Sequence, residues 1–187
     1  MGGVNGAEAL KALYALQEKD LEIDRLRAEA ESLPEELVAL QGQVETLEER
    51  LTNLLERRAE LEREYNRHSL DIEDLSAKEK QAEEEQKRAQ SAREQTQYEN
   101  RIQQIKDRIR ELLELSTPIM EAMENLEAEI AQVEEELAAL RPRLQELLEA
   151  NRARVAELEA AIAAKVEERT AMAAAIPAQI LKEYEAI

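Results

Sequence analysis

The residues best suited to chemistry in this chain are one histidine and many carboxylates. His68 is the only histidine, and Glu64 lies four residues before it. Residues four apart share one face of an α-helix, so this imidazole and carboxylate could supply two ligands to a metal ion. A metal site needs three or four ligands, and the sequence specifies no others. We therefore interpret His68 as a polar residue that sets helix register, and we predict no metal or cofactor in this chain.

Carboxylates occur in runs, for example at residues 83–85 and 134–136. Acid–base catalysis requires two carboxyl groups with separated pKa values in a sheltered pocket. Consecutive acidic residues on a helix instead form a solvated face. The sequence also contains neither a glycine-rich phosphate loop nor a Ser-His-Asp arrangement, and we predict that the protein is not an enzyme.

Seven basic residues cluster around the middle of the chain. They are Lys87, Arg88, Arg93, Arg101, Lys106, Arg108 and Arg110. One interpretation is that they bind an acidic protein or a nucleic-acid backbone. The other is that they form surface ion pairs with nearby acidic residues such as Glu94, Glu99 and Asp107. We favour ion pairs, because the surrounding charge is balanced and no aromatic stacking platform accompanies the cluster.

These side chains must be positioned by long helices. Apolar residues alternate three and four apart from Leu16 to Leu75, and a second such frame runs from Tyr98 to Leu147. This spacing is the heptad pattern of a coiled coil. The segment 76–97 between the frames has no large apolar residue, so it cannot form a seam. We therefore predict an all-α fold, a long, kinked, antiparallel two-helix coiled-coil hairpin.

The domain boundaries follow from this pattern. We expect a flexible segment at 1–6, a first arm at 7–90, a turn at 91–96 and a second arm at 97–187. Helix-interior prolines remove a hydrogen bond, so we expect bends near Pro34, Pro118 and Pro142. The alternative is one continuous helix that pairs with a second chain. The polar segment and the change of frame favour the hairpin.

Composition supports a helical protein. The chain has 187 residues, a net charge of −18, no phenylalanine, no tryptophan and no cysteine. Such a charge disfavours non-specific binding to nucleic acid or to an anionic membrane. No apolar run approaches the roughly 20 residues of a membrane span, and no signal peptide is visible. We therefore expect a cytoplasmic protein without a membrane partner.

Three stretches of the sequence resemble a known bacterial family. The first begins with LYALQ at residues 13–17 and reaches Leu33-Pro34; the second leads from Gln97-Tyr98 to Ile105; the third runs from Glu168-Arg169 to IPAQILKEYEAI at 176–187. They resemble coiled-coil proteins that end in a C4-type zinc ribbon. The second stretch departs from the family pattern at Gln97, Asn100 and Arg101.

The resemblance carries expectations about function. In that family the tyrosine–glutamate segment leads into a ribbon with two cysteine pairs, so zinc is expected only if a ribbon follows Ile187. Members are associated with adaptor roles, including binding of an alternative sigma factor, flagellar regulation and RNA binding. We therefore expect an interaction scaffold with protein partners. The alternative is nucleic-acid binding through the ribbon and the basic cluster.

Apolar residues beside the seam supply further candidates for partner contact. They are Leu13, Leu55, Leu113 and Leu115. Such residues can also belong to the broad apolar stripe of an ordinary amphipathic helix. Open stripes of this kind could pair two hairpins, so a homodimer is a further possibility.

Overall fold

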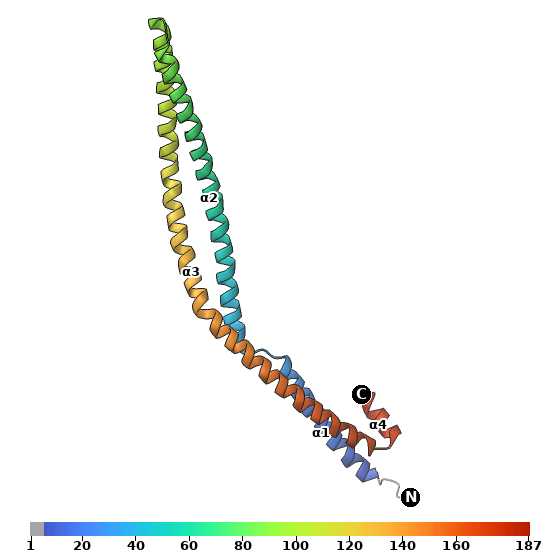
Figure 1. The fold of residues 1–187 in the computed structure, drawn as a ribbon. Helices are drawn as coiled ribbons and strands as arrows, with labels where there is room; N and C mark the ends of the chain where they lie inside the picture. The colour runs from blue at the N-terminus through green and yellow to red at the C-terminus, as the bar shows by residue number, and fades with distance from the viewer. Residues whose placement is uncertain (1–5) are drawn as a thin grey trace. The chain divides into compact units, whose positions relative to one another are not determined.

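A computed structural model describes residues 6–187. It contains four α-helices: α1 (Gly6–Glu31), α2 (Glu35–Lys87), α3 (Ala92–Ala174) and α4 (Ala178–Glu185). The described residues form no strand. Helices α2 and α3 lie side by side and run in opposite directions (Figure 1). The predicted all-α coiled-coil hairpin is confirmed.

The chain divides into two units, which we describe separately. The hairpin unit comprises residues 44–139, and the terminal unit comprises residues 6–43 together with 140–187. The expected flexible segment 1–6 lies outside the described residues, apart from Gly6, which begins α1.

The core of the hairpin unit is the predicted seam. Leu112 and Ile119 are buried in one heptad row of α3, and Ile130 and Leu137 are buried in the other. Within this unit, α2 contributes the buried Leu61, which is 5% exposed. Residues seven apart return to nearly the same helix face, so two rows suffice to keep α3 against α2.

The turn between α2 and α3 lies earlier than predicted. Helix α2 ends at Lys87 and α3 begins at Ala92, so the turn spans 88–91 rather than 91–96. The Ser91 Oγ accepts a hydrogen bond from the Glu94 backbone N–H at 3.1 Å, and a Glu94 carboxylate oxygen accepts one from the Gln90 N–H at 3.1 Å. This arrangement is close to a capping box, which satisfies backbone donors at a helix start. The signal was present as serine followed three residues later by glutamate.

The prolines have different effects on the helices. Pro34 lies in the break between α1 and α2, and its carbonyl accepts the Val38 N–H at 3.1 Å. A proline at a helix start loses no hydrogen bond, because the first N–H groups have no intrahelical partner. Helix α3 instead continues through Pro118 and Pro142 without interruption. Both of these prolines are exposed, so water can satisfy the carbonyl that each leaves unpaired.

His68 is a weak point in the hairpin seam. Its side chain is 17% exposed, and its Nε2 lies 4.0 Å from a Glu64 carboxylate oxygen. The buried Nδ1 atom has no hydrogen-bond partner. A buried polar atom without a partner costs about 1–3 kcal/mol.

Replacing His68 with leucine is therefore expected to stabilise the hairpin by about 1–2 kcal/mol, because leucine fills a seam position without an unpaired nitrogen. Chemical denaturation followed by circular dichroism measures this difference. A lower stability for His68→Leu would mean that the imidazole makes a contact that the seam requires.

The second arm does not extend to the end of the chain as predicted. Helix α3 ends at Ala174, and α4 folds back beside α1 and the end of α3 (Figure 1). The sequence 174–177 contains Ile176 and Pro177, and Ile176 is only 5% exposed. The residue before a proline is biased away from helical conformation, which ends α3 at this point.

Candidate partner-binding surfaces

Helix α4 is held by an apolar cluster in the terminal unit. Leu16 of α1, Ala173 of α3 and Ile176 form its buried centre, and Leu16 is completely inaccessible. Side chains that pack around this centre include Leu13, Met172, Ile180, Leu181 and Tyr184. An eight-residue helix is too short to be stable alone, so α4 depends on this cluster. Leu13, expected to be exposed, is thus partly buried.

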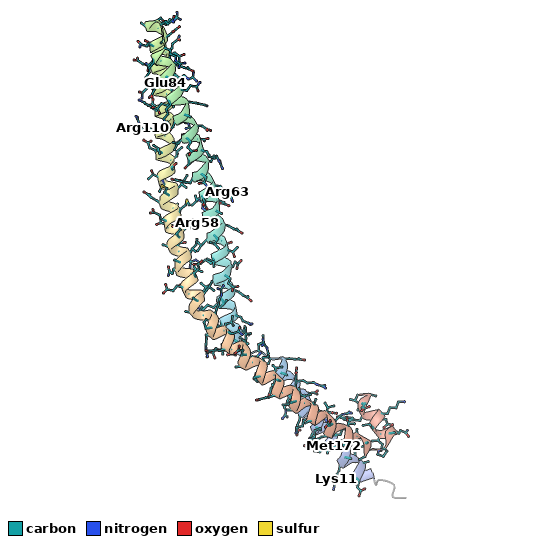
Figure 2. All side chains as sticks on the ribbon, in the orientation of Figure 1. Lys11, Arg58, Arg63, Glu84, Arg110 and Met172 are labelled. Atoms are coloured by element: carbon teal, nitrogen blue, oxygen red, sulfur yellow. The ribbon has the colours of Figure 1, made fainter. Side chains whose placement is uncertain are left out.

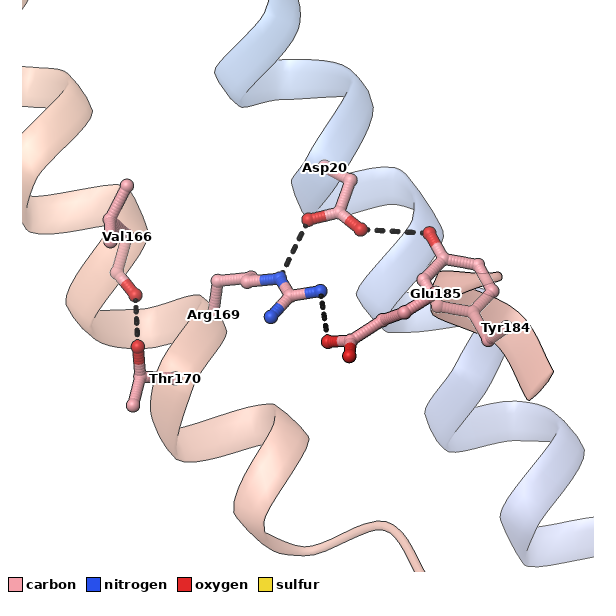
Figure 3. A network of polar contacts seen from close by, with 6 residues as sticks. All are labelled: Asp20, Val166, Arg169, Thr170, Tyr184 and Glu185. Atoms are coloured by element: carbon pink, nitrogen blue, oxygen red, sulfur yellow. Dashed lines mark hydrogen bonds and ion pairs between the residues drawn. The ribbon is translucent and has the colours of Figure 1, made fainter. Parts of the chain in front are cut away.

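A polar network joins the same three elements (Figure 3). The Arg169 Nε donates to Asp20 Oδ1 at 2.9 Å, and an Arg169 Nη donates to Glu185 Oε1 at 3.0 Å. The Tyr184 hydroxyl donates to Asp20 Oδ2 at 2.8 Å. Both carboxylate oxygens of Asp20 are therefore occupied, one by α3 and one by α4. We call Asp20, Arg169, Tyr184 and Glu185 the clasp.

Ion pairs continue from the clasp along α1 and α3. The Lys19 Nζ lies 2.7 Å from Glu168 Oε2, and the Lys165 Nζ lies 3.1 Å from Glu22 Oε2. Hydrogen bonding to Glu168 raises the pKa of Lys19 and lowers the pKa of Glu168. Lys19 occupies a seam position, and only 17% of its side chain is exposed. Its aliphatic stem therefore packs in the seam while its charged group reaches the exposed Glu168.

Tyr184 makes the clasp sensitive to alkaline pH. Burial raises the pKa of Tyr184, and its hydrogen bond to Asp20 adds to this effect. A tyrosine with a raised folded-state pKa contributes stability that is fully present below the unfolded pKa of about 10 and is lost as pH rises through the folded pKa.

We therefore expect Tyr184 to ionise above the usual pKa of tyrosine, about 10, with loss of α4 docking. The difference between the absorbance titrations of wild-type protein and Tyr184→Phe isolates this hydroxyl. A difference curve centred at or below pH 10 would contradict the burial of the hydroxyl.

A second group of apolar residues lies on the outer side of α1. Leu10, Tyr14 and Leu21 are 69%, 65% and 49% exposed. They are spaced four and seven residues apart, which places them on one helical face. The seam-facing residues of the same helix, including Leu16 and Ile23, are buried. We call Leu10, Tyr14 and Leu21 the α1 stripe.

Charged groups surround the α1 stripe. Tyr14 and Leu21 line a shallow open groove with Glu18, Glu22 and Arg25. On the other side of Leu21, a wider groove is bordered by the clasp. The stripe is thus an apolar surface with mainly acidic neighbours.

The basic cluster is divided between paired and unpaired residues. Lys87 pairs with Glu84, Lys106 with Glu79, Arg108 with Glu111 and Arg110 with Asp107, at 3.0–3.9 Å. Within residues 6–187, the side chains of Arg88, Arg93 and Arg101 make no such contact, and all three are exposed. Surface ion pairing thus involves four of the seven residues, and of the three acidic partners expected from the sequence only Asp107 takes part in these pairs.

Sequence reasoning missed Arg154, which connects α3 to the end of α1. Its two Nη atoms donate to the backbone oxygens of Glu29 at 3.0 Å and Ser32 at 2.7 Å. Asn151 Oδ1 accepts from the same guanidinium and orients it. The last carbonyls of a helix lack intrahelical donors, so Arg154 supplies them from another helix. No local pattern marks such a residue, because its partners lie more than 100 positions away.

The described residues lack both a metal-binding cluster and a membrane-spanning helix. Residues 6–187 contain no group of three histidine, cysteine, aspartate or glutamate side chains placed to hold a metal ion. Nor does any described helix combine the length and apolar character required to cross a membrane.

The fold defines the class of protein as an antiparallel coiled-coil hairpin. Residues 16–187 match the family model described as the CT398-like coiled coil hairpin domain. The chain belongs to this family, because the match covers most of its length.

Two solved structures have a similar fold. A Mycobacterium smegmatis protein is 24% identical with a TM-score of 0.77, and the match covers 98% of this chain and 78% of that one. The HP0958 protein from Helicobacter pylori CCUG 17874 is 17% identical with a TM-score of 0.69, and the match covers 96% of this chain and 76% of that one. Comparison with curated proteins gave no match.

Proposed function

We propose that this chain is a non-enzymatic interaction scaffold whose α1 stripe binds a protein partner in the cytoplasm. The observation that carries the proposal is the exposure of Leu10, Tyr14 and Leu21 on one face of α1. Adjacent exposed apolar side chains lose unfavourable hydration when a partner covers them. Tyrosine is also among the residues that contribute most to protein interfaces.

The surroundings of the stripe define the chemistry of this partner. Glu18 and Glu22 lie beside Tyr14 and Leu21, so a complementary surface carries basic residues around an apolar centre. An amphipathic helix with lysine or arginine flanking its apolar face meets this requirement. Both carboxylate oxygens of Asp20 already accept hydrogen bonds, one from Arg169 and one from Tyr184. A partner on the α1 stripe therefore does not need Asp20, and the clasp stays intact when it binds.

The test compares the stripe with the unpaired arginines. A photo-reactive amino acid placed at position 14 should cross-link a partner in cells, and one placed at the exposed Arg63 serves as the control. The partner is then purified and titrated calorimetrically. Tyr14→Ala should weaken its binding roughly tenfold or more, because buried aromatic anchors dominate interface energies.

The triple substitution of Arg88, Arg93 and Arg101 with glutamine should leave that affinity unchanged. A partner whose affinity depends on these arginines and not on Tyr14 would contradict the proposed location. Cross-linking alone decides nothing, since the affinity of the purified partner is the required readout.

A second candidate function is nucleic-acid binding, and the observation that favours it is that Arg88, Arg93 and Arg101 are exposed and have no ion-pair partner among residues 6–187. Phosphate contacts release counterions, so binding should weaken steeply with salt. Fluorescence anisotropy with single-stranded RNA tests this, and the triple glutamine variant should lose affinity and salt dependence. The net charge of −18 favours the protein-binding function.

Two finer expectations come from the family resemblance. The first is that zinc is bound only if a ribbon follows Ile187, and the second is that the partner belongs to transcription or sigma-factor regulation. Zinc analysis of purified residues 1–187 tests the first. These residues should bind no zinc, and zinc bound by them would contradict it.

A further inference from the structure

A stripe along the outer side of α3 has charges arranged with opposite signs at its two ends. Its members are Arg110, Leu113, Thr117, Met120 and Glu124, spaced alternately three and four residues apart. All five are exposed, with Leu113 at 53% and Met120 at 47%. In Figure 2, the Arg110 side chain extends from the side of α3 away from α2. We call these residues the α3 stripe.

The α3 stripe is complementary to itself in the antiparallel direction. Arg110 and Glu124 each lie seven residues from Thr117, and Leu113 and Met120 lie four and three residues from it. A twofold axis at Thr117 therefore places Arg110 opposite Glu124 of a second copy and Leu113 within one residue of the level of Met120 of that copy. In such an isologous interface each pair of residues occurs twice, once on either side of the axis.

We infer that the α3 stripe is a homodimer interface, with a second copy of this chain as its occupant. Charge complementarity selects this occupant, because a stripe with opposite charges at equal distances from its centre fits its own reversed copy. The inference is independent of the α1 stripe, which lies in the other unit.

The polar groups of the stripe tolerate this contact. The Thr117 hydroxyl donates to the Leu113 carbonyl oxygen at 3.1 Å, so covering Thr117 leaves no unpaired donor. Arg110 forms an ion pair with Asp107 at 3.9 Å, and its side chain is 68% exposed. Glu124 makes no ion pair within residues 6–187. An exposed ion pair of this kind is weak, so Arg110 can exchange it for Glu124 of a second copy.

Neighbouring charges limit the strength of the dimer. Glu114 and Glu121 border the stripe and would lie at the solvent-exposed rim of the dimer. The glutamates of the two copies would repel one another there, but water and salt screen this repulsion. The stripe covers about four helical turns, roughly 21 Å. This length places the contact at the small end of specific interfaces, so we expect a reversible dimer that forms at micromolar protein concentration.

A single cysteine tests the position of the twofold axis. The natural sequence has no cysteine, so a disulfide in Thr117→Cys can form only between two copies. We expect rapid formation of covalent dimers by this variant under mild oxidation. Glu129→Cys, on another face of α3, is the matched control and should react much more slowly. Equal rates for the two variants would overturn the assignment.

Charge reversal tests the pairing itself, with mass measured by sedimentation equilibrium. Arg110→Glu and Glu124→Arg should each weaken dimerisation roughly tenfold or more, because each places like charges together twice. The double variant should restore the dimer, whereas Glu129→Arg should behave like wild type. Circular dichroism confirms that each variant is folded.

The rescue distinguishes a specific contact from a folding defect. A wild-type protein that remains monomeric up to about 200 µM would overturn the inference, because specific interfaces of this size bind in or near the micromolar range. Dimers that are insensitive to both reversals, or not restored by the double variant, would also overturn it.

Discussion

Replacing Leu112 with alanine is expected to lower the free energy of unfolding of the hairpin unit by about 2–5 kcal/mol. Leu112 is 1% exposed and lies in the middle of the seam that α3 forms in the hairpin unit. Truncating its side chain leaves a cavity that the surrounding residues fill only in part. Urea denaturation followed by circular dichroism measures the loss.

Leu115 provides the matched control for Leu112. It is the same residue type three positions later and is 53% exposed. Leu115→Ala should change stability by no more than about 0.5 kcal/mol, because no buried packing is lost. Equal effects of the two substitutions would mean that the seam has a different register.

Replacing Ile176 with alanine is expected to release α4 from the terminal unit. Ile176 is 5% exposed and packs against Leu16 and Ala173. Its truncation should remove about 2–5 kcal/mol of local packing, and the eight-residue α4 cannot remain helical without it. Hydrogen exchange should then show at least tenfold faster exchange for the α4 amides.

Ile187→Ala is the control for this experiment, since Ile187 is fully exposed and its side chain makes no buried contact. Exchange in the hairpin unit should be unchanged in both variants, because the two units have separate cores. Unchanged α4 protection in Ile176→Ala would mean that the clasp alone holds the helix, through Arg169 and Tyr184.

The heptad pattern predicted the seam because the physical cause of burial repeats along the sequence. Leu112, Ile119, Val133 and Leu137 occupy expected seam positions and are buried. The pattern was less informative at Leu33, a predicted seam residue that is 51% exposed in the break between α1 and α2. A proline one position later ended the helix before the seam could use this leucine.

The turn and α4 required other kinds of information. The Ser91 and Glu94 cap could have been recognised locally, but loss of apolar periodicity alone placed the turn too late. The return of α4 depends on Ile176 meeting Leu16, two residues 160 positions apart. Such a contact is a tertiary effect that no heptad frame specifies.

The candidate surfaces were predictable only in part. Leu113 and Leu115 are exposed as expected, whereas Leu13 is partly buried because α4 covers it. The sequence pattern did not indicate the α1 stripe, because Leu10 and Tyr14 precede the seam frame, which begins at Leu16. Its exposure became apparent only once the seam-facing side of α1 was known.

The central claim is that one chain forms its own seam and leaves its outer faces for partners. Zero-length carbodiimide coupling of a mixture of unlabelled and heavy-nitrogen-labelled chains tests it most directly. The predicted products join Lys19 to Glu168 and Lys165 to Glu22, pairs that lie 2.7 and 3.1 Å apart, with both peptides from the same isotope population. Linked peptides that mix the two populations would show that these arms pair between chains, which contradicts the hairpin and the surfaces assigned to it.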